Sequence, residues 1–327
     1  MDKLNPLVKE LFGPGNIGHL DPEVCMQKLL EYRAWETDNE INKQLLKQLV
    51  LKYSAAEREL VRLNSELLDK QRRLDQDLKA AAGIQHALLP VTLPETNNLQ
   101  VAWKFIPCEQ IGGDIFNVFP LDSDHVALYM LDVSGHGVPS ALVTVSVSQA
   151  LQPDGGYVLK KHGSGQSVDR IVSPKELLAA LDEQYPLERF DMFFSMIYGI
   201  VNIRQGYLIH ANAGHPPAIL LNPERGVEVI DADGPIIGMG GIPFEEARTE
   251  IARGDKVLFY TDGIIEYENP REGFYGKERF YDLLQESKRQ PITAIMDKII
   301  DSVLEFGDHT PPQDDISLLG FEYMGEQ

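Results

Sequence analysis

Aspartates recur at the ends of apolar, strand-like segments in four places of this 327-residue sequence. A single aspartate in such a position is commonly a turn residue or a helix cap. Four such places in one domain favour a common site, because gathered carboxylates repel one another and take up protons unless a cation neutralises them. The four motifs are IGGDIFN with Asp114, YMLDVSGHG with Asp132, VLFYTDGI with Asp262, and PPQDDISLL with Asp314 and Asp315.

The residue types in these motifs select the kind of metal. Hard divalent cations prefer oxygen ligands, whereas the motifs contain no HExxH, no paired cysteines and no two-histidine, one-carboxylate spacing, which argues against zinc and non-haem iron. We therefore expect magnesium or manganese. Asp132 ends a predicted central strand, where its carboxylate could bridge two ions while the Val133 carbonyl supplies another oxygen. Two ions about 3.5 to 4 Å apart would ready a shared water for attack on phosphorus, without a protein nucleophile.

The segments that carry these motifs predict an α+β fold with mainly antiparallel sheet, because hairpins and meanders alternate with inserted helices. Their number suits two stacked sheets. Residues 152–173 are rich in Gly, Ser and charge and predict a mobile surface loop. Strands are expected at 99–106, 115–121, 125–133, 192–203, 206–213, 217–222, around 228–230, 247–252, 256–262 and 316–323, and helices at 138–151, 174–185, 277–287 and 292–306.

A long helix is expected before this domain, because residues 36–89 contain no proline, only Gly83 among glycines, and many strong helix formers. Alternate steps of four and three residues from Leu49 reach mostly apolar positions as far as Leu88, which predicts a coiled-coil seam and a homodimer. Lys70 and Asp77 interrupt the seam. The alternative is a helix packed on its own domain. We expect a short N-terminal segment at 1–35, a helical coiled-coil linker at 36–89 and a catalytic domain at 90–327.

Composition excludes several classes of partner. The formal charge of -20 would repel nucleic acid and anionic lipid. Cys25 and Cys108 lie far apart without CxxC spacing, so neither a disulfide framework nor a thiolate metal site is predicted. No apolar run approaches the roughly 18 residues of a membrane span, and the N-terminus lacks a signal-peptide stretch. The sequence predicts a cytoplasmic protein.

Taken together, the motifs resemble the SpoIIE-like branch of the PPM metal-dependent serine/threonine phosphatases. The resemblance covers residues 84–323. It implies an αββα sandwich of two antiparallel sheets between helical layers, with a pair of Mn2+ or Mg2+ ions at one end. The ordered motifs that carry it are IQHALLP (84–90), IGGDIFN (111–117), LDVSGHGVPSAL (131–142), NAGHPPAILL (212–221), GPIIGMG (234–240), LFYTDGIIEYENPREGFYG (258–276) and QDDISLL (313–319).

The same resemblance implies roles for the aspartates. Asp132 looks like the ligand shared by both ions and the residue that acts with the metal-activated water, and Asp114 looks like a ligand of one ion. Asp262 and the pair Asp314 and Asp315 look like ligands of the other, with Asp314 favoured because it matches the first position of the family's DD or DN dipeptide.

Three further residues carry expectations. Asn117 stands where many family members have the second acid of GGDxxD, which puts the weaker metal position in question. His136 is a candidate general acid for the leaving serine oxygen, and the competing interpretation is a turn residue bonded to backbone. For His215, in NAGHPP, we expect a structural or rim role.

Within that branch the chain is most similar to bacterial partner-switching regulators, which remove phosphate from a serine or threonine of an anti-sigma factor antagonist. Residues 1–35 are short for a sensor domain, so an upstream sensor protein is expected as a partner. The IQHALLP segment is predicted to act as a lever between the coiled coil and the metal site.

Two alternatives compete with an enzyme. One is a PPM-fold pseudophosphatase that binds a partner without turnover, for which Asn117 is the support. The other is a coiled-coil scaffold, which explains only residues 36–89. A diguanylate cyclase is excluded because Ile-Phe follows the GGD triplet where that signature has Glu-Phe.

Overall fold

The computed structural model describes residues 27, 40–90, 93, 98–108, 110–135, 137–153, 157–160 and 170–325. The chain divides into two units, residues 1–72 and 73–327, and the boundary falls inside helix α3 (Glu40–His86). The predicted long helix is therefore confirmed over most of its range. None of the described helices combines the length and apolar composition needed to cross a bilayer.

Helix α3 exposes a row of apolar side chains within the first unit. Leu60, Leu63 and Leu67 are 69%, 49% and 62% exposed, and they follow the three- and four-residue steps of the predicted seam. On another side of the helix, Arg62 forms ion pairs with Glu59 and Glu66, spacings that support an exposed helix. The coiled coil and the homodimer stay predictions.

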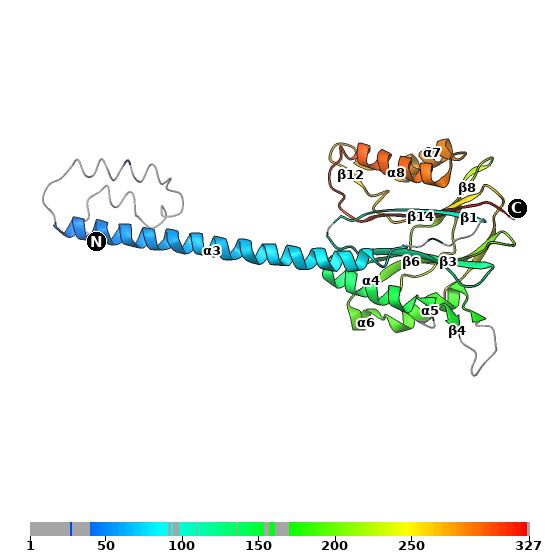
Figure 1. Cartoon of the computed structure of the whole chain (residues 1–327), viewed down its shortest axis with the longest axis horizontal. Coiled ribbons are helices and arrows are strands. Elements are labelled where there is room, and N and C mark those ends of the chain that lie inside the picture. The colour runs from blue at the N-terminus through cyan, green and yellow to red at the C-terminus, as the bar shows by residue number, and fades with distance from the viewer. Residues whose placement is uncertain are drawn as a thin grey trace. The chain divides into compact units, whose positions relative to one another are not determined.

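The second unit is built on two five-stranded antiparallel sheets (Figure 1). The first sheet has the order β1 (Leu99–Ile106), β14 (Ile316–Tyr323), β11 (Lys256–Tyr260), β8 (Ala218–Asn222) and β9 (Gly226–Ile230). The second has the order β10 (Ala247–Glu250), β7 (Tyr207–Ala213), β6 (Phe194–Asn202), β3 (His125–Val133) and β2 (Asp114–Pro120).

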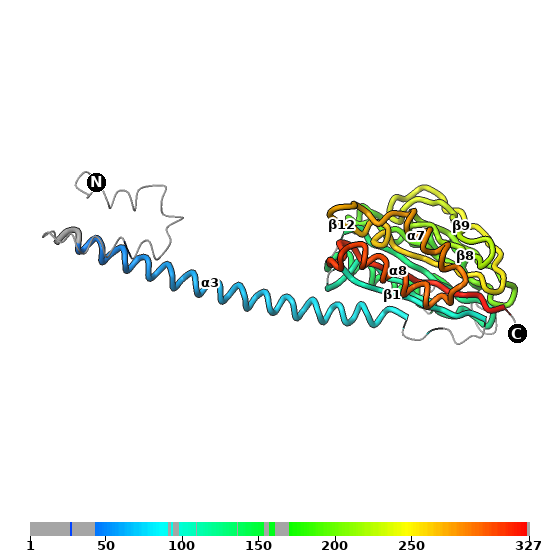
Figure 2. The backbone as a smooth tube through the Cα atoms, turned by 90° about the horizontal axis from the view of Figure 1, so that it is seen from above, coloured from blue at the N-terminus to red at the C-terminus, as the bar shows by residue number. Residues whose placement is uncertain are grey.

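Helices cover the outer faces of both sheets. Helices α4 (Val138–Ala150), α5 (Pro174–Gln184) and α6 (Leu187–Phe190) lie on the side of the second sheet. Helices α7 (Lys277–Ser287) and α8 (Ile292–Phe306) lie over the first sheet, as the view from above shows (Figure 2). The predicted αββα sandwich is confirmed.

Apolar periodicity explains how the layers adhere. Helix α8 buries a stripe at spacings of three and four residues, the pattern of a helix with one face on a core. Burial of each such side chain contributes about 1.5 to 3 kcal/mol. The stripe consists of Ile292, Ile295, Met296, Ile299 and Val303, and a larger core fills the space between the two sheets.

Several short elements differ from the sequence-based expectation. Residues 152–173 were expected to form a loop, but they include the paired strands β4 (Leu159–Lys160) and β5 (Arg170–Ile171). The sequence also gave no sign of α6 or of the hairpin of β12 (Glu268–Asn269) and β13 (Gly273–Phe274). These elements are two to four residues long, too short for a periodic pattern to develop.

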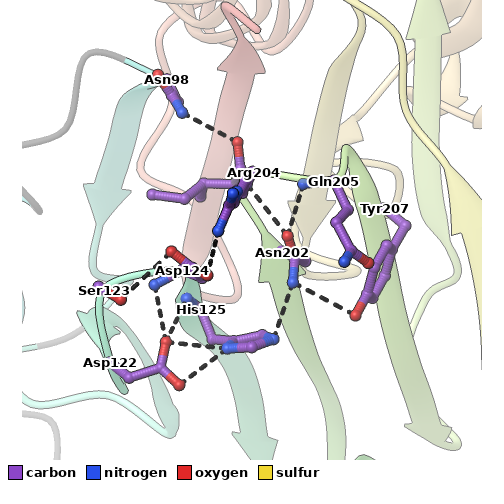
Figure 3. Close-up of polar contacts among 10 residues, drawn as sticks. Asn98, Asp122, Ser123, Asp124, His125, Asn202, Arg204, Gln205 and Tyr207 are labelled. Atoms are coloured by element: carbon purple, nitrogen blue, oxygen red, sulfur yellow. Dashed lines mark hydrogen bonds and ion pairs between the residues drawn. The ribbon is translucent and has the colours of Figure 1, made fainter. Parts of the chain in front are cut away.

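A polar network fixes the turns at one end of the second sheet (Figure 3). Asp122 accepts the backbone N–H of Asp124, and its carboxylate lies 2.9 Å from Nδ1 of His125. The other ring nitrogen of His125 lies 3.0 Å from Nδ2 of Asn202, whose Oδ1 accepts the N–H of Gln205. The β2–β3 and β6–β7 turns are thereby joined, and the opposite end of these strands carries the acidic motifs.

Candidate functional site

Asp114 and Asp132 form the centre of the acidic site. They are directly opposite each other in the β2–β3 register, so their side chains lie on the same face of the sheet, with Cβ atoms roughly 5 Å apart. Asp114 is 2% exposed, and its Oδ2 accepts a 2.6 Å hydrogen bond from the hydroxyl of Ser317 in β14. The site therefore spans the two sheets.

Asp315 connects the start of β14 to the GGD segment. Its side chain is buried, one oxygen accepts the N–H of Cys108 at 2.9 Å, and the other accepts the N–H of Asp114 at 3.3 Å. Its own carbonyl accepts a hydrogen bond from the hydroxyl of Thr261. Asp314, the preceding residue, is exposed. The two acids of the pair thus lie in different environments, one tied to backbone amides and the other open to solvent.

Asp262 follows β11, and glycines allow its segment to approach the acidic pair. A Cβ at Gly263 would lie 2.1 Å from the carbonyl oxygen of Asp315. A Cβ at Gly112 would lie 1.8 Å from a carboxylate oxygen of Asp315. Neither position can hold a side chain unless the neighbouring segment moves.

Burial, and after it repulsion by neighbouring carboxylates, raises the pKa values of three of these acids. Burial, and then the charge of Asp132, raises the pKa of Asp114 well above its ordinary value. Burial, and then the charges of Asp262 and Asp314, raises the pKa of Asp132 to about 7. Burial, and then Asp314, raises the pKa of Asp262 to about 6. The fold therefore places Asp114, Asp132, Asp262 and Asp314 close enough for neighbouring carboxylates to raise the pKa values of the first three.

The donor chemistry fits a hard divalent cation, because buried carboxylates that raise one another's pKa values are relieved by a bound cation. Within the described ranges, however, no three Asp, Glu, His or Cys side chains are disposed to hold an ion. The hydrogen bonds explain part of this arrangement, since both oxygens of Asp315 face backbone amides and Oδ2 of Asp114 faces Ser317. The chemistry and location of the donors fit, and the side chains of Asp114 and Asp315 form internal hydrogen bonds.

The Val133 carbonyl borders the same site. A Cβ at Gly113 would lie 2.7 Å from this oxygen and 3.4 Å from Oδ1 of Asp132. The N–H of Val133 donates to the carbonyl of Gly113 at 3.3 Å, and the hydroxyl of Thr144 in α4 donates to that carbonyl at 2.8 Å. Helix α4 thereby fixes the glycine segment against the end of β3.

Of the two histidines considered from sequence, only His215 can be located, because His136 lies outside the described residues. His215 is 4% exposed, and burial lowers its pKa to about 3, so it is neutral at physiological pH. Its Nδ1 lies 2.8 Å from Oγ of Ser195, and Ser195 is opposite Asp132 in the β3–β6 register. The sequence did not indicate Ser195, because a lone serine in an apolar strand has no distinguishing pattern.

The last turn of α3 contacts the GGD segment directly. Gln85 is buried, donates to the carbonyl of Gly112 at 2.8 Å and accepts its N–H at 3.1 Å. Asn117 donates to the carbonyl of Leu88 at 3.3 Å. Because Asn117 is three residues from Asp114 on one strand, its side chain lies on the opposite face of β2. It therefore stabilises the segment after α3.

Comparison with known proteins decides the family. The family described as Stage II sporulation protein E (SpoIIE) matches residues 122–323. The chain belongs to this family. Protein IcfG of Synechocystis is 26% identical over 78% of this chain and 42% of its own length, and phosphoserine phosphatase RsbP of Bacillus subtilis is 26% identical over 70% and 53%. The chain spans about half the length of these relatives.

Two solved structures share the fold. The SiaA-PP2C domain of Pseudomonas aeruginosa superposes with a TM-score of 0.62 at 25% identity, over 77% of this chain and 98% of that domain. A structure of RsbU and RsbW domains from Mycobacterium tuberculosis gives a TM-score of 0.59 at 24% identity, over 73% of this chain and 64% of that one. The αββα sandwich is of the PP2C type.

Proposed function

We propose that this chain is a metal-dependent phosphatase that hydrolyses phosphoserine or phosphothreonine in a protein. The observation that carries the proposal is the pair Asp114 and Asp132, side by side between two sheets, with pKa values raised by burial and by neighbouring carboxylates. The SpoIIE relatives RsbP and RsbU, both named phosphoserine phosphatases, support the same reaction class.

We assign the ion ligands by combining the motifs with the bonding of each acid. Asp132 would be shared by two ions, Asp114 and the Val133 carbonyl would bind one, and Asp262 and Asp314 would bind the other. Asp315 organises the site through backbone amides, which supports the choice of Asp314 as the direct ligand of the pair. Bound Mn2+ or Mg2+ would neutralise the carboxylates, polarise the phosphoryl group and make a water more acidic.

The chain's own groups hold this arrangement in place. Thr144 and the Val133 N–H fix the carbonyl of Gly113, so the backbone beside Asp132 keeps its orientation when a phosphate approaches. His136 is our candidate for donating a proton to the departing serine oxygen. His215 is neutral and buried, and its role is to hold Ser195 beside Asp132.

We further propose that the substrate is a phosphorylated anti-sigma factor antagonist of the STAS type. The resemblance of the motifs to bacterial partner-switching regulators suggests this class of partner, and the relatives RsbP and RsbU are named phosphoserine phosphatases. We expect a homodimer through residues 36–89 and a separate upstream sensor protein. The pairing of Gln85 with Gly112 supports control through the α3 junction. A cytoplasmic location stays a prediction from composition.

The competing function is a pseudophosphatase that binds its partner without turnover. It is favoured by the side-chain arrangement, in which no three potential ligands among the described residues are ready for an ion. The deciding assay measures hydrolysis of p-nitrophenyl phosphate and of a phosphoserine STAS domain with manganese, with chelator, and with Asp132→Asn. Manganese-dependent turnover that Asp132→Asn abolishes supports the enzyme. A wild-type chain inactive with both substrates and with several divalent ions supports the binding module.

A further inference from the structure

Apolar side chains are exposed close to the acidic site. Val138 and Leu142, in the first turns of α4, are 44% and 65% exposed, and Phe193, just before β6, is 40% exposed. The same helix buries Val143 and Val147 against the sheet. Exposed apolar residues are unremarkable when they are scattered, whereas a group of them marks a contact surface.

Hydrogen bonds locate this group next to the end of β3. The N–H of Phe193 donates to Oγ of Ser134 at 3.1 Å, and the N–H of Ser134 donates to the carbonyl of Phe193 at 2.9 Å. Ser134 is two residues from Asp132. Val138 and Leu142 follow on the helix that starts directly after this turn, so all three apolar side chains belong to the rim of the candidate site.

A second exposed apolar segment follows Ile237, which pairs with Phe194. Met239 and Ile242 are 57% and 53% exposed in the loop after the Phe194–Ile237 bridge. This loop is held firmly, because the N–H of Gly238 donates to Asp182 at 2.7 Å. Asp182 thereby anchors the start of this loop. We name Val138, Leu142, Phe193, Met239 and Ile242 the apolar rim.

We propose that the apolar rim docks the folded domain that carries the phosphoserine, an inference that rests on the proposed phosphatase function. A phosphoserine that reaches Asp132 brings the surrounding protein surface over Ser134 and Phe193, because these residues adjoin the end of β3. The chain has a formal charge of -20, which repels a phosphorylated, negatively charged partner. Beyond the contact of the phosphoryl group itself with the site, apolar contact at the rim would hold the partner, and the partner should carry an apolar patch beside its phosphoserine.

The test compares three substrates in the full-length chain with manganese: p-nitrophenyl phosphate, a serine-phosphorylated STAS domain, and the short phosphopeptide around the same serine. The double variant Leu142→Ser/Phe193→Ser should lower kcat/KM for the folded domain by about tenfold or more, mainly through KM, and leave the other two substrates unchanged. Val229→Ser is the matched control, since Val229 is 47% exposed on β9, the edge strand of the other sheet. Equal Tm values would show that the variants fold.

A binding titration with the phosphorylated STAS domain separates this proposal from the proposed function. Weaker binding by the double variant, with no turnover in the wild type, supports the docking surface and overturns the phosphatase. Unchanged binding and unchanged kcat/KM for the folded domain overturn the docking surface and leave the phosphatase standing. If the double variant changes only the molecular mass measured by sedimentation, the rim is a contact between copies of this chain. That result also overturns the docking proposal.

Discussion

Replacing Asp132 by asparagine should stabilise the metal-free protein. The pKa of Asp132 is raised from its ordinary 3.8 to about 7, first by burial and then by Asp262 and Asp314. A carboxyl with a raised pKa in the folded state contributes stability that is complete below the unfolded pKa and is lost as pH rises through the folded pKa. The window of loss therefore lies between about pH 4 and pH 7, and above it the ionised group opposes folding.

The size of the effect follows from the shift. At about 1.36 kcal/mol per pKa unit, ionised Asp132 disfavours the folded state by at most about 4 kcal/mol. Solvent reaches part of this side chain and the neighbouring carboxylates can turn apart, so we expect about 1 to 2 kcal/mol. For a unit of this size the Tm of Asp132→Asn should exceed that of the wild type by roughly 2 to 8 °C without metal.

Thermal unfolding with chelator, at about pH 5 and about pH 8, measures this directly. The Tm of the wild type should fall between these two pH values, and the Tm of Asp132→Asn should fall less. Added manganese should restore the wild type and have little effect on the variant. Asp301→Asn, an exposed position on α8, is the control for removal of one negative charge. If Asp132→Asn is no more stable than the wild type at the higher pH, the inference that ionised Asp132 disfavours the folded state is refuted.

Three further predictions concern residues around the acids. Ser195→Ala should leave Nδ1 of the buried His215 without its partner, lower the metal-free unfolding free energy by about 1 to 3 kcal/mol, and raise the manganese concentration for half-maximal stabilisation several-fold, because Ser195 is opposite Asp132 in the register; calorimetric titration checks this. Gly112→Ala should cost about 1 to 3 kcal/mol of unfolding free energy in urea, since its Cβ would overlap the Asp315 carboxylate. Gln85→Leu should leave the buried Gly112 amide and carbonyl unpaired, cost about 1 to 3 kcal/mol, and speed amide exchange there.

Each of these has a control and a contrary result. Gln71→Leu, at an exposed position of α3, is the control for Gln85→Leu. Equal exchange rates of the Gly112 amide in both variants would contradict the claim that Gln85 holds this backbone segment. Gly83→Ala controls for Gly112→Ala, because a Cβ at Gly83 meets no atom within 4 Å. If Ser195→Ala responds to manganese as the wild type does, the Ser195 hydroxyl has no role in metal binding.

Local signals predicted much of the fold. The bounds of β1, β3, β14, α7 and α8 agree with those expected from sequence, because turn residues and a consistent apolar period mark both ends. The shared environment of the aspartates was also predictable, since each lies at or next to the end of an apolar strand. The position of Asn117 on the opposite face of β2 from Asp114 was missed, because the expected strand began at residue 115 and left Asp114 outside it, whereas β2 begins at Asp114.

Long-range contacts account for what the sequence left open. Within the acidic pair, Asp315 is distinguished from Asp314 by hydrogen bonds to the backbone of Cys108 and Asp114, which lie about two hundred positions away in the chain. Ser195 likewise gains its relation to Asp132 from the β3–β6 register alone. No local sequence pattern predicts such contacts. The order of the motifs indicated the chemistry, but the fold was needed to distinguish the roles of Asp314, Asp315 and Ser195.

The location of the acids between two sheets has a consequence for ion binding. Asp114 and Asp132 belong to the second sheet, whereas Asp262 and Asp314 belong to segments of the first. An ion held by both sets binds only when the sheets are packed, so its binding free energy adds to the free energy of sheet packing. The pairing of Gln85 with Gly112 acts on the second sheet's side of this junction. A small displacement of that segment would therefore alter ion affinity without any change in the ligands themselves.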